Sequence, residues 1–318
     1  MEWSAVTRIP CKISLYERET YFREGWADFV GTMGPRALLQ LHPLALLLIK
    51  PDGLAAGKAP AIMDFVCKND FSIVAATFIN LTRLHSRELW RHQLACATLD
   101  RLAANDLVHR GQALLLILRD TTNQALPGSV RLSELKGCSD LKLQPPLCLR
   151  RVIGQPNRIF SYFHVSDEPA DFIRELGIIL EPEARKQVLL TVAGNTAMNV
   201  DDLLESVVSD DLIFDKTASL TRLRAALHRC IQNGCTDSRT LDTVSAAIER
   251  MTAGEPIAWC TLELALKAAD IQLDRWDKAL LAASFITYDE PPWEKAIGAV
   301  DPELWRSDID FPTKCQPS

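Results

Sequence analysis

Four short apolar stretches between residues 44 and 180 constrain the fold of this chain more than any other feature. They are 44–49 (LALLLI), 71–79 (FSIVAATFI), 113–118 (ALLLIL) and 158–163 (RIFSYF). Each is rich in aliphatic and aromatic residues and is bounded by turn formers, which predicts a short strand.

The stretches between and after these strands have the periodicity of helices. Apolar residues recur at helical spacing over 59–69, 82–95 and 99–109, and a further helix is expected over 168–180. The order is strand, helix, strand, helices, strand, long loop, strand, helix. This order predicts an α+β fold, a ferredoxin-like split βαβ sandwich.

The chain has 318 residues, more than one typical domain needs, and 47% of them are hydrophobic. We expect an N-terminal extension over 1–43 that packs on an α+β domain over 44–180. Residues 181–306 favour amphipathic helices and predict an added C-terminal all-helical domain. Residues 307–318 are expected to form a disordered tail.

Charge is distributed unevenly along the chain. Residues 1–180 hold 21 Lys and Arg against 18 Asp and Glu, whereas residues 181–318 hold 14 against 23. A mildly basic half can hold an anionic ligand such as a nucleotide, and the acidic half argues against nucleic acid as a partner.

The sequence predicts a cytoplasmic protein without membrane association. Its start lacks the charged-then-apolar pattern of a secretory signal, and its longest apolar run, 44–49, is far too short to span a bilayer. The nine cysteines are an odd number and contain no C-x-x-C pair. We interpret them as free thiols in a reducing compartment.

Two kinds of ligand site are disfavoured by spacing. The segment GLAAGKA (53–59) has three residues between its glycines and Ala after its Lys, where a phosphate-binding loop needs four residues and a hydroxyl. His85, His92, His109 and His228 form no ligand pair with one another, with Cys or with a carboxylate, so no metal site is expected.

Two distant segments carry candidate chemistry. LLLIKPDG (46–53) places Lys50 at a strand end, and FHVSDEPADFIREL (163–176) closes a strand with His164 before a helix that contains Glu175. A carboxylate two turns into that helix could orient one ring nitrogen of His164 and leave the other free to attack phosphorus. Taken singly, such a Lys is more often a solvated loop residue and such a His is more often structural.

Together the two segments resemble the nucleoside diphosphate kinase family. That family has I-K-P-D near its start and H-G-S-D-S near its end, with a Glu, preceded by Arg, eleven residues after the catalytic His. Lys50, His164, Ser166, Arg174 and Glu175 stand at the matching positions. The resemblance implies that His164 is the nucleophile, held by Glu175 and assisted by Ser166, with Lys50 on the phosphates.

The middle of the chain matches the family pattern more loosely. VRLSELKGCSD (130–140) resembles the phosphate-binding loop, with Ser139 in place of Thr and Arg131 close enough to substitute for the loop Arg. PPLCLRR (145–151) resembles the Pro-Gly-Thr-Ile-Arg segment. Arg150 then carries the phosphate-binding guanidinium, with Arg151 as the alternative.

Several positions depart from the family. Ser161 stands for the Asn that contacts sugar and phosphate, Val165 for the Gly after the His, and Trp90 for the Tyr of F-Y-x-x-H. The Phe that stacks on the base is replaced near Leu99, and Ser133 stands for the loop Arg. The resemblance therefore implies retained phosphate chemistry and altered nucleoside recognition.

The function that the resemblance implies is that of an ATP-dependent phosphotransferase, a kinase. ATP or another triphosphate, with Mg²⁺, would form a phosphohistidine on His164, which would pass the γ-phosphate to a nucleotide or to a specialised small-molecule acceptor. The acceptor is unidentified, and the helical half is expected to help form its site. The alternative is a catalytically inactive nucleotide-binding or regulatory protein on the same fold. A homo-oligomer is possible, since the family commonly forms tetramers or hexamers.

Overall fold

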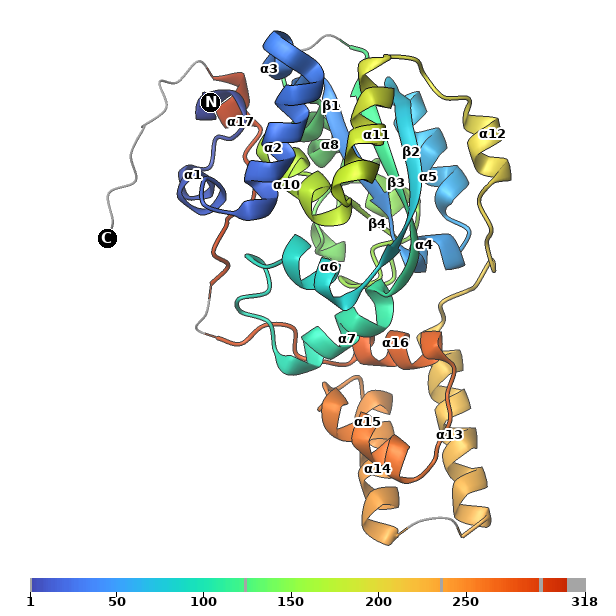
Figure 1. Ribbon diagram of the computed structural model, residues 1–318. Helices are drawn as coiled ribbons and strands as arrows, with labels where there is room; N and C mark the ends of the chain where they lie inside the picture. Colours follow the sequence, from blue (N-terminus) through green and yellow to red (C-terminus); the bar gives the residue numbers. More distant parts are fainter. Residues whose placement is uncertain (1, 123–124, 235–236, 292–293, 308–318) are drawn as a thin grey trace.

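Four strands form one antiparallel sheet in the order β2-β3-β1-β4 (Figure 1). The strands are β1 (Leu44–Ile49), β2 (Phe71–Leu81), β3 (Gly111–Asp120) and β4 (Phe163–Val165). Because β3 lies between β1 and β2, and β1 lies between β3 and β4, this is the strand order of a split βαβ sandwich. The predicted fold class is confirmed.

The computed structural model describes residues 2–122, 125–234, 237–291 and 294–307. Helices connect and flank the strands. Before the sheet lie α1 (Pro10–Tyr16), α2 (Thr20–Met33) and α3 (Ala37–Leu41), with the 3-10 turns η1 (Trp3–Ala5) and η2 (Gly34–Arg36). Within the sheet region lie α4 (Pro51–Ala55), α5 (Ala59–Lys68), α6 (Arg83–Leu89), α7 (Leu99–His109), α8 (Gly128–Lys136), η3 (Leu141–Leu143), α9 (Leu149–Val152) and α10 (Pro169–Ile179).

The remaining regular elements of the described chain are helices. Its elements are α11 (Pro182–Ala193), α12 (Val200–Glu205), α13 (Lys216–Gln232), α14 (Ser238–Thr252), α15 (Trp259–Ala268), α16 (Arg275–Ser284) and α17 (Glu303–Arg306). No helix among the described residues is long and apolar enough to cross a membrane. The tail predicted to be disordered lies, from residue 308 onward, outside the described residues.

Strand β1 is the centre of the molecule, and its side chains are buried on both faces of the sheet. Leu44, Leu46 and Leu48 pack in one hydrophobic cluster with α2, α10 and α11. Ala45, Leu47 and Ile49 pack in the other, with α4, α5 and α8. A strand that is covered on both faces needs an unbroken apolar run, which explains LALLLI.

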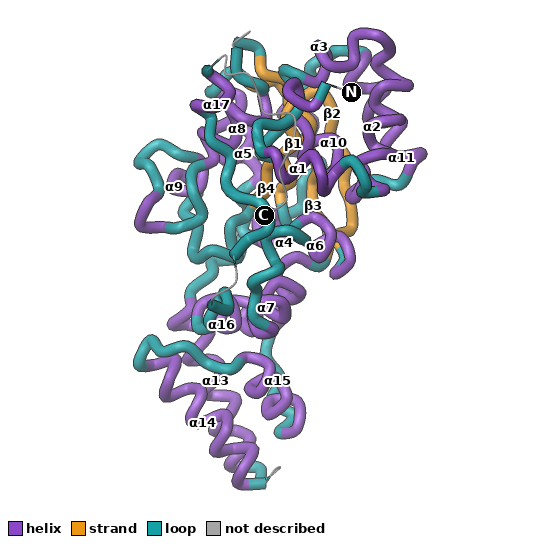
Figure 2. The backbone as a smooth tube through the Cα atoms, turned by 90° about the vertical axis from the view of Figure 1, so that its left-hand side faces the viewer, coloured by secondary structure: helices purple, strands orange, loops and turns teal. Residues whose placement is uncertain are grey.

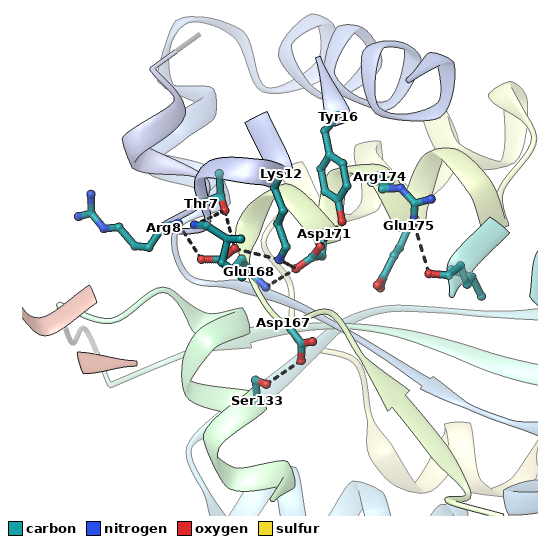
Figure 3. Close-up of polar contacts among 12 residues, drawn as sticks. Thr7, Arg8, Lys12, Tyr16, Ser133, Asp167, Glu168, Asp171, Arg174 and Glu175 are labelled. Carbon is teal, nitrogen blue, oxygen red and sulfur yellow. Dashed lines mark hydrogen bonds and ion pairs between the residues drawn. The ribbon is translucent and has the colours of Figure 1, made fainter. Parts of the chain in front are cut away.

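The N-terminal segment is fastened to the start of α10 by a buried polar cluster (Figure 3). The Lys12 ammonium lies 2.9 Å from Glu168 Oε2 and 2.6 Å from Asp171 Oδ2, and Tyr16 donates to Asp171 Oδ1 at 2.7 Å. Burial works against the charge of Lys12, but Asp171 and Glu168 raise its pKa above the ordinary value. Each buried charge therefore has a partner of opposite sign.

Helices α13–α16 surround a third hydrophobic cluster, in which Trp259 is fully buried. In both views α13 and α14 extend away from the sheet, while α16 lies beside α7 (Figures 1 and 2). The same cluster includes Val108 of α7 and Ile159 and Phe160, which precede β4. The domain boundary at residue 180 stays a prediction.

The last strand begins later than the sequence predicts. The interval 158–163 was expected to be extended, but the strand is β4, which contains His164 at its centre. The side-chain oxygen of Asn157 accepts from the backbone N–H of Ile159 and of Phe160, both at 3.0 Å, and Tyr162 has a φ of 63°. These local contacts turn the chain where a regular strand would run straight.

Close packing of α2 on α10 gives a prediction about stability. A Cβ at Gly177 of α10 would lie 2.1 Å from the carbonyl oxygen of Tyr21, whereas a Cβ at Gly31 of α2 would meet nothing within 4 Å. We expect Gly177→Ala to lower the free energy of unfolding by about 1–3 kcal/mol, because two backbones must move apart. Gly31→Ala should raise it by roughly 0.5–1 kcal/mol through helix propensity. Urea unfolding measures both, and equal effects at the two sites would contradict this account of the interface.

Candidate functional site

The end of β1 and the centre of β4 bring the two predicted motifs together. Leu48 pairs with His164 and Ile49 with Phe163, so Lys50, the next residue, lies beside the His164 strand. The backbone N–H of Lys50 continues the pairing by donating to the carbonyl of Tyr162 at 2.9 Å. The sheet therefore brings together two segments that are over a hundred residues apart in the sequence.

His164 is held by a carboxylate from α10. Its Nε2 lies 2.9 Å from Oε1 of Glu175, a buried residue whose side chain points from α10 toward the sheet (Figure 3). Burial raises the pKa of Glu175, and the neighbouring His164 opposes that shift. A carboxylate oxygen accepts a hydrogen bond, so Nε2 carries the ring proton and Nδ1 keeps its lone pair in the neutral imidazole. The ring of Trp90 stands at right angles to His164, with centroids 5.5 Å apart.

Lys50 is enclosed rather than solvated, with 1% of its surface exposed. Its ammonium lies 2.9 Å from the carbonyl oxygen of Ile159, 3.2 Å from Nε2 of His109 and 3.6 Å from Oδ1 of Asp52. Burial lowers the pKa of Lys50, and Asp52 opposes this shift. Asp52 in turn accepts from the backbone N–H of Tyr162 at 2.9 Å, so it joins the Lys50 turn to the start of β4.

Arg150 is the second cation of the site. It donates to the carbonyl of Gly137 at 2.7 Å, and its Nε is buried without a hydrogen-bond partner among the described residues. Burial lowers the pKa of the guanidinium, and Asp167 opposes this shift. A buried donor without a partner is costly unless a ligand or water satisfies it.

Lys50, His164 and Arg150 line one cavity of about 610 Å³. Six residues predicted from the sequence lie on its wall: Lys50, Trp90, Ser139, Arg150, Ser161 and His164. Glu175 lies behind His164 and reaches the cavity only through that ring.

Three predicted residues lie elsewhere. Ser166 is fully buried, and its hydroxyl accepts from the backbone N–H of Leu46 at 3.2 Å, which ties β4 to β1. Arg131 pairs with Asp120 at 3.1 Å, at the far end of β3. Arg151 is exposed on α9 and donates to the carbonyl of Gln144. Of the two arginines proposed for phosphate, it is Arg150 that lines the cavity.

A carboxylate on the cavity wall is matched with a cation. Asp167 accepts from Ser133 at 2.7 Å and pairs with Lys136 at 2.5 Å. Burial works against its charge, but Lys136 and Lys12 hold the pKa of Asp167 below its ordinary value. Ser133 stands where the resembled family has a loop Arg. Its hydroxyl donates to Asp167, which pairs with Lys136.

Sequence reasoning missed the wall that comes from the C-terminal segment, residues 294–306. Its cavity-lining residues are Lys295, Ile297, Gly298, Ala299, Val300 and Pro302. The segment is fixed where Ala296 N–H donates to the carbonyl of His92 at 3.1 Å and where Trp305 Nε1 donates to Glu168 at 3.0 Å. No motif marks it, because its partners, such as the His92 carbonyl, Glu168 and Glu134, lie far away in the sequence.

His109, at the end of α7, was also missed. It had been weighed only as a metal ligand, yet it lines the cavity between Lys50 and Trp90. A single His at a helix end carries no local signal of such a place.

No family model matches this chain, and no curated protein matches it. Solved structures that it resembles over 44% of its length are nucleoside diphosphate kinases. The enzyme from Aquifex aeolicus is 18% identical, with 96% of that chain covered and a TM-score of 0.37. A nucleoside diphosphate kinase family protein from Babesia bovis is 17% identical, with 90% covered and a TM-score of 0.37. The enzyme from Halobacterium salinarum, in complex with CDP, is 14% identical, with 89% covered and a TM-score of 0.36.

The contact with Glu175 predicts the tautomer of His164. In long-range ¹H–¹⁵N spectra of protein labelled in its imidazoles, His164 should show a protonated Nε2 and a bare Nδ1 at neutral pH. Glu175→Ala removes the acceptor and should shift the ring toward a mixture of tautomers. A wild-type ring protonated on Nδ1 alone would contradict the described contact.

Proposed function

We propose that this protein is an ATP-dependent phosphotransferase that works through a phosphohistidine on His164. The observation that carries the proposal is the 2.9 Å contact between His164 Nε2 and the buried Glu175, on a ring that faces a cavity lined by Lys50 and Arg150. A purely structural role for His164 would not explain an unprotonated ring nitrogen that faces a cavity lined by cations. The resemblance of the two motifs to nucleoside diphosphate kinases points the same way.

The chemistry proposed for His164 is nucleophilic. The Nδ1 lone pair would form a bond to the γ-phosphorus while the bond from that phosphorus to the bridging oxygen breaks, and the diphosphate would leave with the electron pair. Glu175 would stabilise the positive charge that develops on the imidazole. The second step would transfer the phosphoryl group from Nδ1 to the acceptor, in a ping-pong scheme.

Binding of the triphosphate would fall to the cations of the cavity. Arg150 offers an unpartnered buried Nε, which phosphate oxygens would satisfy, and Lys50 lies beside the His164 strand. Fixed positive charge aimed at the equatorial oxygens is the main source of catalysis in phosphoryl transfer. Ser139 and Ser161, on the same wall, could add hydroxyl hydrogen bonds.

Magnesium, if it takes part, would come with the nucleotide. The described residues contain no group of three or more His, Cys, Asp or Glu side chains that could hold a metal ion. Mg²⁺ would arrive on the phosphates of the triphosphate, where it would neutralise charge, and we assign no step to it.

For the acceptor, we propose a specialised nucleotide or small phosphorylated molecule that contacts the C-terminal segment. Lys295 adds an exposed positive charge to the cavity wall, and Ile297 to Val300 add apolar and backbone surface. A cytoplasmic location is also proposed, because Cys67, Cys96, Cys138, Cys148, Cys230 and Cys260 are free thiols.

One observation favours the alternative of a catalytically inactive nucleotide-binding protein. The Lys50 ammonium already has three protein groups around it, so it can meet a phosphate oxygen only by weakening one of those contacts. A protein that binds a nucleotide without reaction would have the same cavity but would not transfer phosphate.

The first test is chemical labelling. Incubation with γ-³²P-ATP should give acid-labile, base-stable label on the wild-type protein, and His164→Ala should reduce it to background. His228→Ala, at an exposed position of α13, is the matched control and should label like the wild type. Undiminished label in His164→Ala would sink the assignment.

Calorimetry with a non-hydrolysable triphosphate separates the two candidate functions. Binding together with labelling supports the transferase. Binding to a wild-type protein that never acquires label supports the inactive module.

The C-terminal wall predicts an effect on the second step alone. Lys295→Glu should slow discharge of the isolated phosphoprotein to ADP or another anionic acceptor by roughly fivefold, because it reverses an exposed charge on the cavity wall. The effect should shrink in high salt. Lys186→Glu, at an exposed position of α11 outside the cavity, is the control. Equal discharge rates for both variants would exclude a role for Lys295.

A further inference from the structure

The enclosed Lys50 ammonium has one neighbour that neither the motif nor the proposed chemistry uses. His109 ends α7, is 5% exposed and places Nε2 3.2 Å from Lys50 Nζ. Its other nitrogen, Nδ1, lies 3.3 Å from the hydroxyl of Ser86, a buried residue of α6. The chain Ser86–His109–Lys50 therefore runs from α6 to the cavity wall through buried polar atoms.

The direction of hydrogen bonding along this chain follows from what each group can do. An ammonium has only donors, so a ring nitrogen that contacts it must accept. His109 Nε2 then keeps its lone pair, and the ring proton sits on Nδ1 and is donated to Ser86. A second positive charge here would face Lys50 at contact distance, so the ring stays neutral.

The surroundings of His109 favour a neutral ring. Trp90 covers the ring at a centroid distance of 4.5 Å, and the charged or titratable groups that face it are Lys50, His164 and Arg87. Burial, followed by the charge of Lys50, lowers the pKa of His109 well below its ordinary value, although the carbonyl of Ile159 opposes the shift. No carboxylate contacts the ring among the described residues.

Two of the three N–H groups of the Lys50 ammonium have close acceptors, and the third has only a distant one. Ile159 O and His109 Nε2 lie at 2.9 and 3.2 Å, whereas Asp52 Oδ1 lies at 3.6 Å and has no hydrogen-bond partner among the described residues. In a tetrahedral ammonium, two fixed N–H bonds set the direction of the third.

We propose that His109 is a positioning residue for Lys50. Its neutral imidazole, oriented by Ser86 and covered by Trp90, accepts a hydrogen bond from the ammonium and aims the remaining N–H for a phosphate oxygen. The contact itself stands independently, but its consequence for phosphate rests on the proposed function.

Imidazole spectra test the contact without reference to activity. In the wild type, His109 should show a protonated Nδ1 and a bare Nε2, the reverse of His164, and His109→Gln identifies its signals by their loss. Lys50→Met removes the donor and should move His109 toward the Nε2–H tautomer, which can donate to Ile159 O. A wild-type His109 protonated on Nε2, or signals that ignore Lys50→Met, would overturn the proposal.

A double-mutant cycle tests the consequence. His109→Phe should slow phosphohistidine formation at saturating ATP by about 10- to 100-fold, because a misaimed cation loses its effect on the reacting group. His109→Gln retains an acceptor and should recover most of the rate. In a Lys50→Ala background, His109→Phe should add nothing, since its effect passes through Lys50. Additive slowing in the cycle would mean a merely structural His and would overturn the positioning role.

The outcomes remain separable from those of the proposed function. A wild-type protein without any label overturns the phosphotransferase, and the spectra then decide the His109–Lys50 contact alone. If His109→Phe fails to fold in thermal unfolding, His109→Gln and Ser86→Ala complete the comparison. Ser86→Ala should slow labelling less than His109→Phe, because it removes only the orientation of the ring.

Discussion

The buried Lys50 ammonium is the interaction on which the candidate site depends. A charge without solvent must be matched by protein groups, and those groups come from three parts of the chain: Asp52 in the following turn, His109 on α7 and the carbonyl of Ile159 before β4. One of these partners also makes a second contact that positions a neighbouring strand. Asp52 also holds the backbone of Tyr162 at the entry to β4, and β4 carries His164. Satisfying one cation therefore sets the position of the nucleophile candidate.

A second set of buried polar residues fixes the position of Glu175, the carboxylate that contacts His164. Glu175 is placed by α10, and the first turn of α10 is held by Lys12 and Tyr16 of the N-terminal segment and by Trp305 of the C-terminal segment. Arg8 lies over the Trp305 ring at 4.8 Å, so the two ends of the described chain meet at this helix. Residues that do not line the cavity thus contribute to the geometry of the His164–Glu175 pair, because they restrain the helix that bears the carboxylate.

The fold was predictable where the pattern of side chains is local. LALLLI indicated a short strand, and the alternation of strands and helices predicted the split βαβ order. The reach of Glu175 to His164 was also expected, from helical spacing. That Lys50 and His164 belong to one site was implied only by the family resemblance. Arg131 was misplaced because its true partner, Asp120, lies at the opposite end of the sheet. A sequence match cannot distinguish an arginine that faces a cavity from one that pairs across a turn.

Sequence spacing could not predict contacts that form only because the fold brings distant segments together. The wall formed by residues 294–306 meets the cavity because Trp305 reaches Glu168, a pairing across 137 residues. His109 meets Lys50 because α7 ends where β1 ends. No sequence motif signals either contact, because the residues involved form no recognisable local pattern.

The two histidines of this cavity carry their ring proton on different nitrogens, and their hydrogen-bond partners determine which nitrogen it is. Glu175 accepts from Nε2 of His164 and so leaves Nδ1 bare, which suits a nucleophile. Lys50 donates to Nε2 of His109 and so leaves that ring proton on Nδ1, toward Ser86. Trp90 contacts both rings. In the proposal the two rings therefore have separate tasks: His164 would act on the substrate, and His109 would act only on the lysine that would bind it.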